Sequence, residues 1–176
     1  MNFFSLFKRN IIYKLKKKIN IDNDNFENKS LDDLFHHYGS DKANIWRPKN
    51  LTGHGYSVFY NTHFKNLKQK KIDILEIGSF SGASAAAFSK YFPKSNIYCF
   101  DINISNFKFF SNRIHVFGVD IKDHNRLLKT LKKILNKDDL NNFDIIIDDG
   151  SHNLKDILMS IKFFFKYLSK KGLYII

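Results

Sequence analysis

The chain has 176 residues, enough for one domain with a buried core and few for two. Its net charge of +12 comes from scattered lysines, without zinc-ligand spacing or an aromatic RNA-binding signature, so we expect no nucleic-acid partner. No apolar run reaches membrane-spanning length, no signal-peptide cleavage site follows the start, and the single cysteine lies in an apolar run. These features indicate a cytoplasmic protein.

Residues 1–29 are predicted to form a basic amphipathic extension and a linker, ahead of a domain at 30–176. Apolar residues recur there at helical spacing beside a basic run. They are Phe4, Phe7, Ile11, Leu15 and Ile19 on the apolar side, and Lys8, Arg9, Lys14, Lys16, Lys17 and Lys18 on the basic side. Such a helix suits peripheral contact of residues 1–20 with the inner face of an anionic membrane. Packing on its own domain is the alternative.

A helix is predicted to begin after Ser30, which forms a capping box with Asp33, and to end at Gly39. Residues 39–60 are loop-like, but their aromatic side chains argue against disorder. We expect this segment to fold over the mouth of a ligand pocket. The alternative is a surface loop that packs on its own side chains.

A short apolar strand over 72–77 leads through a glycine-containing turn into a small-residue helix over 83–92. A ligand that touches backbone is expected at such a turn. The dinucleotide pattern Gly-x-Gly-x-x-Gly would need glycine at two positions where this chain has Phe80 and Ala83. The turn is therefore a poor match to a dinucleotide site.

The pattern acidic-x-Gly-x-x-x-Gly, in contrast, is complete in Glu76, Gly78 and Gly82. It resembles motif I of class I S-adenosylmethionine-dependent methyltransferases. The resemblance implies that Glu76, Gly78, Ser79 and Gly82 hold the methionine part of S-adenosylmethionine. A strand-to-helix turn without a ligand is the alternative.

Two further aspartates end the next apolar runs. Asp101 lies about twenty residues beyond the glycine turn, where a carboxylate accepts both ribose hydroxyls of a nucleoside. Asp120 follows the run 114–119, where class I methyltransferases often carry an acidic residue near the adenine amino group. An ordinary turn at the end of the strand is the alternative for Asp120.

The remaining pattern completes an α/β domain. Further strands are predicted over 96–102, 114–119, 143–148 and 173–176, and apolar helix faces over 127–135 and 154–168. Repeated β-α-β units indicate a Rossmann-like, doubly wound parallel sheet with strand order 3-2-1-4-5 and helices on both faces.

Residues 148–152 read Asp-Asp-Gly-Ser-His at the end of the fourth strand, the edge where open α/β sheets bind ligands. With the Gly-Ser-Asp-Lys loop at 39–42, this run resembles metal-dependent sugar O-methyltransferases of the macrolide-tailoring kind. The resemblance implies that Asp149, with Asp148 as a second candidate, binds Mg²⁺, and that His152 takes the proton of the acceptor hydroxyl. The alternative is that Asp149 and Ser151 only cap the following helix.

The chain stops at Ile176, inside an apolar strand. The resembled family continues with an acidic pair and two more strands, so we expect a C-terminally truncated domain that lacks those strands. Methyl transfer from S-adenosylmethionine to a hydroxyl of a sugar, a related small molecule or a glycan is the function implied by the resemblance, with weak or absent turnover by this chain. The alternative is a non-catalytic basic module that binds a surface or a partner. An uncovered strand edge or the N-terminal helix could also mediate formation of a homo-oligomer.

Overall fold

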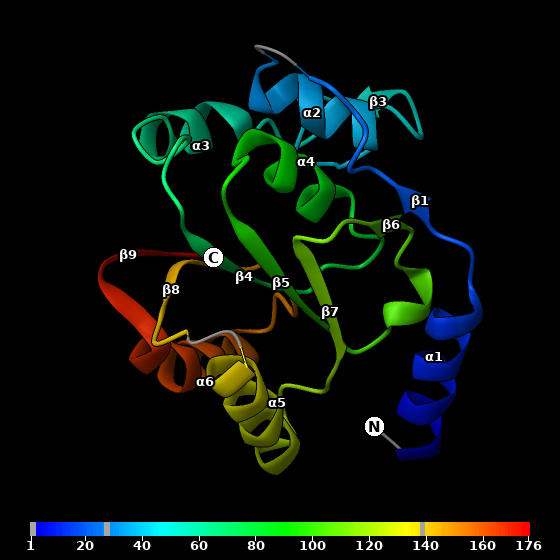
Figure 1. Ribbon diagram of the computed structural model, residues 1–176, viewed down its shortest axis with the longest axis vertical. Coiled ribbons are helices and arrows are strands. Elements are labelled where there is room, and N and C mark those ends of the chain that lie inside the picture. The colour runs from blue at the N-terminus through cyan, green and yellow to red at the C-terminus, as the bar shows by residue number, and fades with distance from the viewer. Residues whose placement is uncertain (1–2, 27–28, 138–139) are drawn as a thin grey trace.

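The centre of the protein is a five-stranded parallel sheet, seen in the computed structural model, which describes residues 3–26, 29–137 and 140–176 (Figure 1). The strand order is β7-β5-β4-β8-β9. The strands are β4 (Asp73–Ile77), β5 (Asn96–Asp101), β7 (Ile114–Gly118), β8 (Phe143–Asp148) and β9 (Leu168–Ile175). Numbered along the sheet-forming strands this order is 3-2-1-4-5, and the predicted fold class is confirmed.

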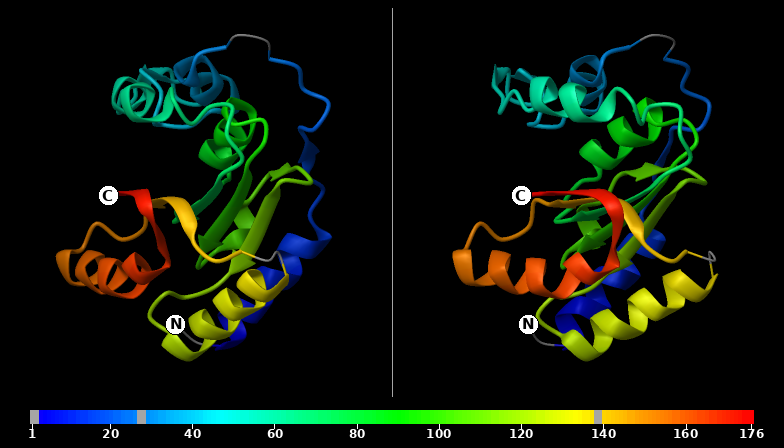
Figure 2. Two further views of the ribbon diagram at one scale, coloured as in Figure 1. Left: turned by 60° about the vertical axis from the view of Figure 1, so that its left-hand side comes forward. Right: turned by 90° about the vertical axis from the view of Figure 1, so that its left-hand side faces the viewer.

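Helices cover both faces of the sheet (Figure 2). The first face carries α2 (Leu31–Tyr38), α3 (Ser57–Phe64) and α4 (Ala83–Tyr91), and the second carries α5 (His124–Lys137) and α6 (Leu154–Phe164). Successive residues of β4 point into opposite cores, with Ile74 packed in the first and Leu75 in the second. Because both faces are buried, the strands read as continuous apolar runs.

The predicted limits of α2 are confirmed. The Ser30 hydroxyl accepts the Asp33 backbone N–H at 3.1 Å, and the Asp33 carboxylate accepts the Ser30 N–H at 3.1 Å. Gly39 ends the helix at φ 78°, in the left-handed region that glycine adopts without a Cβ penalty.

Residues 39–60 contain more regular structure than the loop that the sequence suggested. β2 (Ile45–Trp46) and β3 (Leu51–Thr52) form a small antiparallel hairpin, and α3 begins at Ser57. The Trp46 indole N–H donates to the Gly39 carbonyl at 3.1 Å, which ties the hairpin back to the end of α2. Strands of two residues leave too short a pattern to be read from sequence.

The boundary between α6 and the last strand also differs from the prediction. The apolar helix face was expected to reach Leu168, but α6 ends at Phe164, the 3-10 turn η2 (Phe165–Tyr167) follows, and Leu168 already starts β9. Leu168 packs into the second core from its strand position, so the apolar spacing did not distinguish the two structures.

The N-terminal segment lies against the domain. α1 (Phe3–Leu15) contacts the 3-10 turn η1 (Ile104–Asn106) and β7. After it, β1 (Ile19–Asn20) pairs in parallel with β6 (Phe109–Phe110). A domain boundary at residue 29 stays a prediction. In the described ranges, no helix is both long and apolar enough to cross a bilayer.

The turn from β4 into α4 depends on two glycines in the left-handed region, Gly78 at φ 85° and Gly82 at φ 77°. A Cβ on Gly82 would lie 2.4 Å from the ring of Phe107, which is buried beneath the turn. The close approach of this ring therefore requires glycine at position 82.

We expect Gly82→Ala to lower the free energy of unfolding by about 2–5 kcal/mol, because a left-handed alanine costs about 1–2 kcal/mol and overpacking about 1–3 kcal/mol. Gly55→Ala is the control, since φ there is 65° and the new Cβ would meet only the end of the Asn44 side chain, at 3.1 Å. The control should lose only about 1–2 kcal/mol in urea unfolding. Equal losses would show that the Phe107 contact does not matter.

Candidate functional site

A pocket of about 470 Å³ opens at the carboxyl ends of β4, β5, β7 and β8. Four of the predicted site residues line it: Gly78, Asp101, Asp120 and Asp149. Of the other predicted cofactor residues, Glu76 lies in β4 and Ser79 and Gly82 lie in the turn that follows it, and none of the three is part of the lining. The edge of the sheet thus brings the predicted residues of four strands to one place, as expected for a doubly wound sheet.

Asp101 ends β5 and is held in a fixed orientation by the backbone. Its Oδ2 accepts the Phe80 N–H at 2.7 Å and its Oδ1 accepts the Asn103 N–H at 2.5 Å. Each carboxylate oxygen can accept a second hydrogen bond, so the group remains able to bind a ligand hydroxyl. The carboxylate is oriented before any ligand arrives, which lowers the entropy cost of binding.

Phe80 explains part of the shape of the pocket. Its φ is 42°, a left-handed conformation that costs a non-glycine residue roughly 1–2 kcal/mol, and its exposed side chain is part of the pocket lining. The backbone at position 80 therefore has the left-handed conformation that a glycine would adopt, but the side chain presents an aromatic surface to the pocket.

The end of the pocket near β7 is mainly apolar with acidic groups at its rim. Ile102 and Ile121 line it beside Asp120, whose Oδ1 accepts the Lys122 backbone N–H at 3.0 Å. At the same end the Lys122 ammonium pairs with Asp156 at 2.9 Å. A flat heteroaromatic ring with polar edges suits such surroundings.

Glu76, near the end of the central strand, is fully buried. Its Oε1 accepts the Ser84 hydroxyl at 2.5 Å, whereas its Oε2 has no hydrogen-bond partner within the described residues. Burial raises the pKa of Glu76, and the nearby Lys42 ammonium opposes part of this rise. A buried carboxylate oxygen without a donor favours binding of a cationic or hydrogen-bond-donating group.

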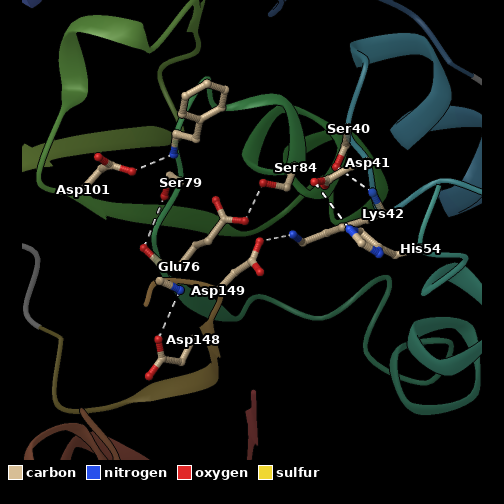
Figure 3. A network of polar contacts seen from close by, with 12 residues as sticks. Ser40, Asp41, Lys42, His54, Glu76, Ser79, Ser84, Asp101, Asp148 and Asp149 are labelled. Atoms are coloured by element: carbon tan, nitrogen blue, oxygen red, sulfur yellow. Dashed lines mark hydrogen bonds and ion pairs between the residues drawn. The ribbon is translucent and has the colours of Figure 1, made fainter. Parts of the chain in front are cut away.

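Lys42 was not among the predicted site residues, although the Gly-Ser-Asp-Lys loop was noticed. It is almost fully buried, and its ammonium donates to Asp149 Oδ2 (Figure 3). Burial lowers the pKa of Lys42, but the carboxylates of Glu76 and Asp149 outweigh it and raise the pKa overall. A lysine that pairs with Asp149 and lies near Glu76 could not be found from the local pattern around residue 42.

The segment 39–60 reaches the site through Lys42. Backbone hydrogen bonds hold this loop, among them those from the His54 N–H to the Asp41 carbonyl at 2.7 Å and from the Tyr56 N–H to the Lys42 carbonyl at 3.1 Å. No residue of this fully described segment lines the pocket itself. It therefore covers the side of the turn where Glu76 lies, and its role as a lid over the pocket mouth stays a prediction.

Asp148 points away from the cluster of Glu76, Lys42 and Asp149 (Figure 3). Its Oδ1 accepts the Gly150 N–H at 3.3 Å and its Oδ2 accepts the hydroxyl of Tyr174 on β9 at 3.4 Å. Burial raises the pKa of Asp148. These contacts tie β8 to β9 and give Asp148 a structural role, while a role in metal binding stays a prediction.

His152 is exposed on the loop before α6 and is not part of the pocket lining, which includes its neighbour Ser151. The cap of α6 is Asn153, whose side chain accepts the Lys155 N–H at 3.0 Å. Asp149 is thus not needed as the cap, which leaves it available for another role. The assignment of His152 as a base stays a prediction.

The described residues include no group of three or more His, Cys, Asp or Glu side chains that could hold a metal ion. Asp149 is part of the pocket lining, and one of its oxygens already accepts from Lys42. These residues alone do not fit a complete magnesium site, which needs several oxygen ligands.

The substitution Glu76→Gln tests how the buried carboxyl group of Glu76 makes the stability of the protein depend on pH. Because burial raises its pKa above the ordinary 4.5, the folded state binds more protons than the unfolded state as pH rises from that value. The Glu76 contribution to the free energy of unfolding should then fall with rising pH, by at most about 1.4 kcal/mol per pH unit. We therefore expect the variant to gain stability relative to the wild type as pH rises above about 4.5 in urea unfolding.

Asp33→Asn is the control with the opposite sign. Hydrogen bonds from Ser30 lower the pKa of Asp33, so this carboxylate contributes stability at neutral pH that is lost as pH falls through the lowered value. The variant should lose stability relative to the wild type as pH rises. A Glu76→Gln difference that does not change with pH would contradict the raised pKa.

Comparison with known proteins finds O-methyltransferases among the relatives of this chain. No protein-family model matches the chain. The mycinamicin VI 2''-O-methyltransferase of Micromonospora griseorubida is 28% identical over 130 residues, which are 70% of this chain and 31% of that protein. The L-olivosyl-oleandolide 3-O-methyltransferase of Streptomyces antibioticus is 28% identical over 158 residues, 85% of this chain and 37% of that protein.

Solved structures give the same relationship. The MycE methyltransferase of the mycinamycin biosynthetic pathway, in complex with Mg, SAH and mycinamycin VI, superposes with a TM-score of 0.68 at 25% identity, covering 84% of this chain and 38% of that one. A ribosomal RNA methyltransferase from Plasmodium falciparum, at 22% identity and a TM-score of 0.51, shares the fold. The chain spans about a third of the length of the curated relatives it matches.

Proposed function

We propose that this chain, a homologue of the class I S-adenosylmethionine-dependent sugar O-methyltransferases, binds S-adenosylmethionine for methyl transfer to a hydroxyl group. The observation that carries the proposal is the Asp101 carboxylate, fixed by two backbone N–H groups and part of the lining of a pocket beside the glycine turn. A carboxylate at this place in a doubly wound sheet suits the two hydroxyls of a ribose.

The pocket residues fit the other parts of the cofactor. Ile102, Ile121 and the ring of Phe80 offer apolar surface for adenine, with Asp120 at the edge for its amino group. Gly78 exposes backbone for the methionine part, and the unsatisfied Oε2 of Glu76, near the end of β4, would be an acceptor for a positively charged amino group.

The charge of the pocket separates this cofactor from a dinucleotide. Its lining includes Asp101, Asp120, Asp149 and Asp156 but one lysine, Lys122. An anionic pyrophosphate would be repelled by these carboxylates, whereas the sulfonium and ammonium groups of S-adenosylmethionine are attracted. Phe80 argues in the same direction, because the dinucleotide pattern needs glycine there.

In methyl transfer the acceptor hydroxyl attacks the sulfonium methyl group of the bound cofactor, and residues of this chain would assist that attack. A sugar hydroxyl is a weak nucleophile, and an imidazole such as that of His152 can accept its proton. Exposure of His152 on the loop beside Ser151 makes it accessible to an acceptor at the rim of the pocket. Asp149 would contribute one carboxylate to a Mg²⁺ site, and one of its oxygens already accepts from Lys42.

The acceptor follows from the relatives. The two relatives described above are a mycinamicin VI 2''-O-methyltransferase and an L-olivosyl-oleandolide 3-O-methyltransferase, which supports a sugar, a related small molecule or a glycan as the acceptor of this chain. Formation of a homo-oligomer stays a prediction.

Calorimetric titration with S-adenosylhomocysteine should show saturable binding, and Asp101→Asn should weaken it about ten- to hundredfold, since a hydrogen bond to a charged group contributes about 1.5–3 kcal/mol. Asp123→Asn is the matched control. Asp123 lies outside the pocket lining, and an asparagine there can still accept the Arg126 N–H. Absence of binding at millimolar ligand would refute the proposal, and displacement of the ligand by NAD would favour a dinucleotide site.

A further inference from the structure

α1 presents an apolar face to solvent although it is a fixed part of the domain. We propose that this face of α1, formed by Phe4, Phe7, Ile11 and Leu15, docks on an anionic lipid surface. The proposal concerns attachment of the protein and does not depend on the bound cofactor or on catalysis.

The opposite face of α1 is packed on the domain. Leu6 is buried, and Tyr13 packs edge-to-face against Phe107, with ring centroids 6.3 Å apart. The Arg9 guanidinium donates to the Ile102 carbonyl and the Lys16 ammonium to the Ser105 carbonyl, both at 3.0 Å. These contacts fix the orientation of the helix, so its outer face is a defined surface of the protein.

The outer face is more apolar than a solvated helix face should be. Phe4, Phe7, Ile11 and Leu15 are 74, 54, 41 and 82% exposed. Their spacing of three or four residues places them on one stripe along the helix. Apolar residues that are exposed singly are ordinary, but a continuous stripe of large side chains indicates a binding surface.

The charges around the stripe identify its partner. Lys8 and Lys14 are exposed on the two flanks of the stripe, Lys17 follows the end of the helix, and along the chain the nearest acidic residue is Asp22. Basic groups beside an apolar stripe match the negative headgroups and the acyl chains of an anionic bilayer.

A second copy of the chain fits this surface less well than a lipid does. In a symmetric pair formed by α1 the same patch would face itself, which brings the basic flanks of both copies together. Like charges placed opposite each other disfavour such an interface. Since no described helix can span a bilayer, α1 would lie on the surface of the membrane.

The test is sedimentation of the full chain with vesicles of phosphatidylcholine alone or with about 30% phosphatidylserine, the anionic lipid of cytoplasmic leaflets. We expect binding to the anionic vesicles only, weakening as salt is raised. Phe7→Ser with Ile11→Ser should reduce the apparent affinity at least about tenfold, because the acyl-chain contact is lost. Val58→Ser with Leu154→Ser removes two other exposed apolar side chains and should change nothing.

A second pair of variants separates docking by α1 from the general attraction of a basic protein. Lys8, Lys14 and Lys17 are changed to glutamine in one variant, and the exposed Lys129, Lys132 and Lys133 of α5 in the other. The α1 variant should lose at least about fivefold more affinity, since each lysine near the surface contributes about 1 kcal/mol.

Equal losses in the two lysine variants would overturn the proposal, as would failure of the wild type to bind anionic vesicles. Size-exclusion chromatography gives a third outcome against it, namely a dimer that Phe7→Ser with Ile11→Ser converts to monomer. The variants change exposed side chains only, so unaltered thermal unfolding confirms that each remains folded.

Discussion

The buried carboxylate of Glu76 is the group on which the arrangement of the site depends. It lies near the end of the central strand, and the groups around it come from three other segments: Ser84 from α4, Lys42 from the loop after α2, and Asp149 from the end of β8. A charge in this position is favourable only where it is paired and hydrogen-bonded. The Lys42 ammonium therefore does more than join two loops, because it makes two neighbouring carboxylates tolerable inside the protein.

One acceptor in this arrangement has no donor among the described residues. Oε2 of Glu76 has no partner within the described residues, and a buried acceptor in that state is costly by about 1–3 kcal/mol. Part of the stability of the fold is thus given up at the site, and under the proposed function the amino group of the cofactor would donate to this oxygen. Such local conflicts with the rules of stable packing are expected where a protein binds something.

The sequence predicted those features of the fold that depend on patterns of residues close together along the chain. The strand order follows from repeated β-α-β units, and the turn at Gly78 and Gly82 follows from residues that tolerate left-handed backbone. Asp101 was found because the end of the second strand is a fixed place in this topology. Asp148 and Asp149 could not be told apart, since their difference arises from the direction of successive side chains at a strand end and from Tyr174 on β9.

What the sequence could not predict involves residues far apart along the chain. Lys42 and Asp149 are 107 positions apart, and nothing near either residue indicates the other. The apolar spacing of α1 was noticed, but which of its faces is covered depends on η1 and β7. The packed face proved to be that of Leu6 and Tyr13, and the predicted stripe is exposed.

The distribution of charge connects the site with the surface. The protein as a whole carries +12, yet four aspartates and one lysine line its pocket. An anionic surface is therefore attracted to the protein generally, and most strongly where Lys8, Lys14 and Lys17 adjoin an apolar stripe, but it is repelled from the pocket. A cationic cofactor would instead be attracted to the pocket. At short range the pocket carboxylates outweigh the distant lysines, because the charges of those lysines are screened. The two kinds of ligand are thus attracted to different places on the protein.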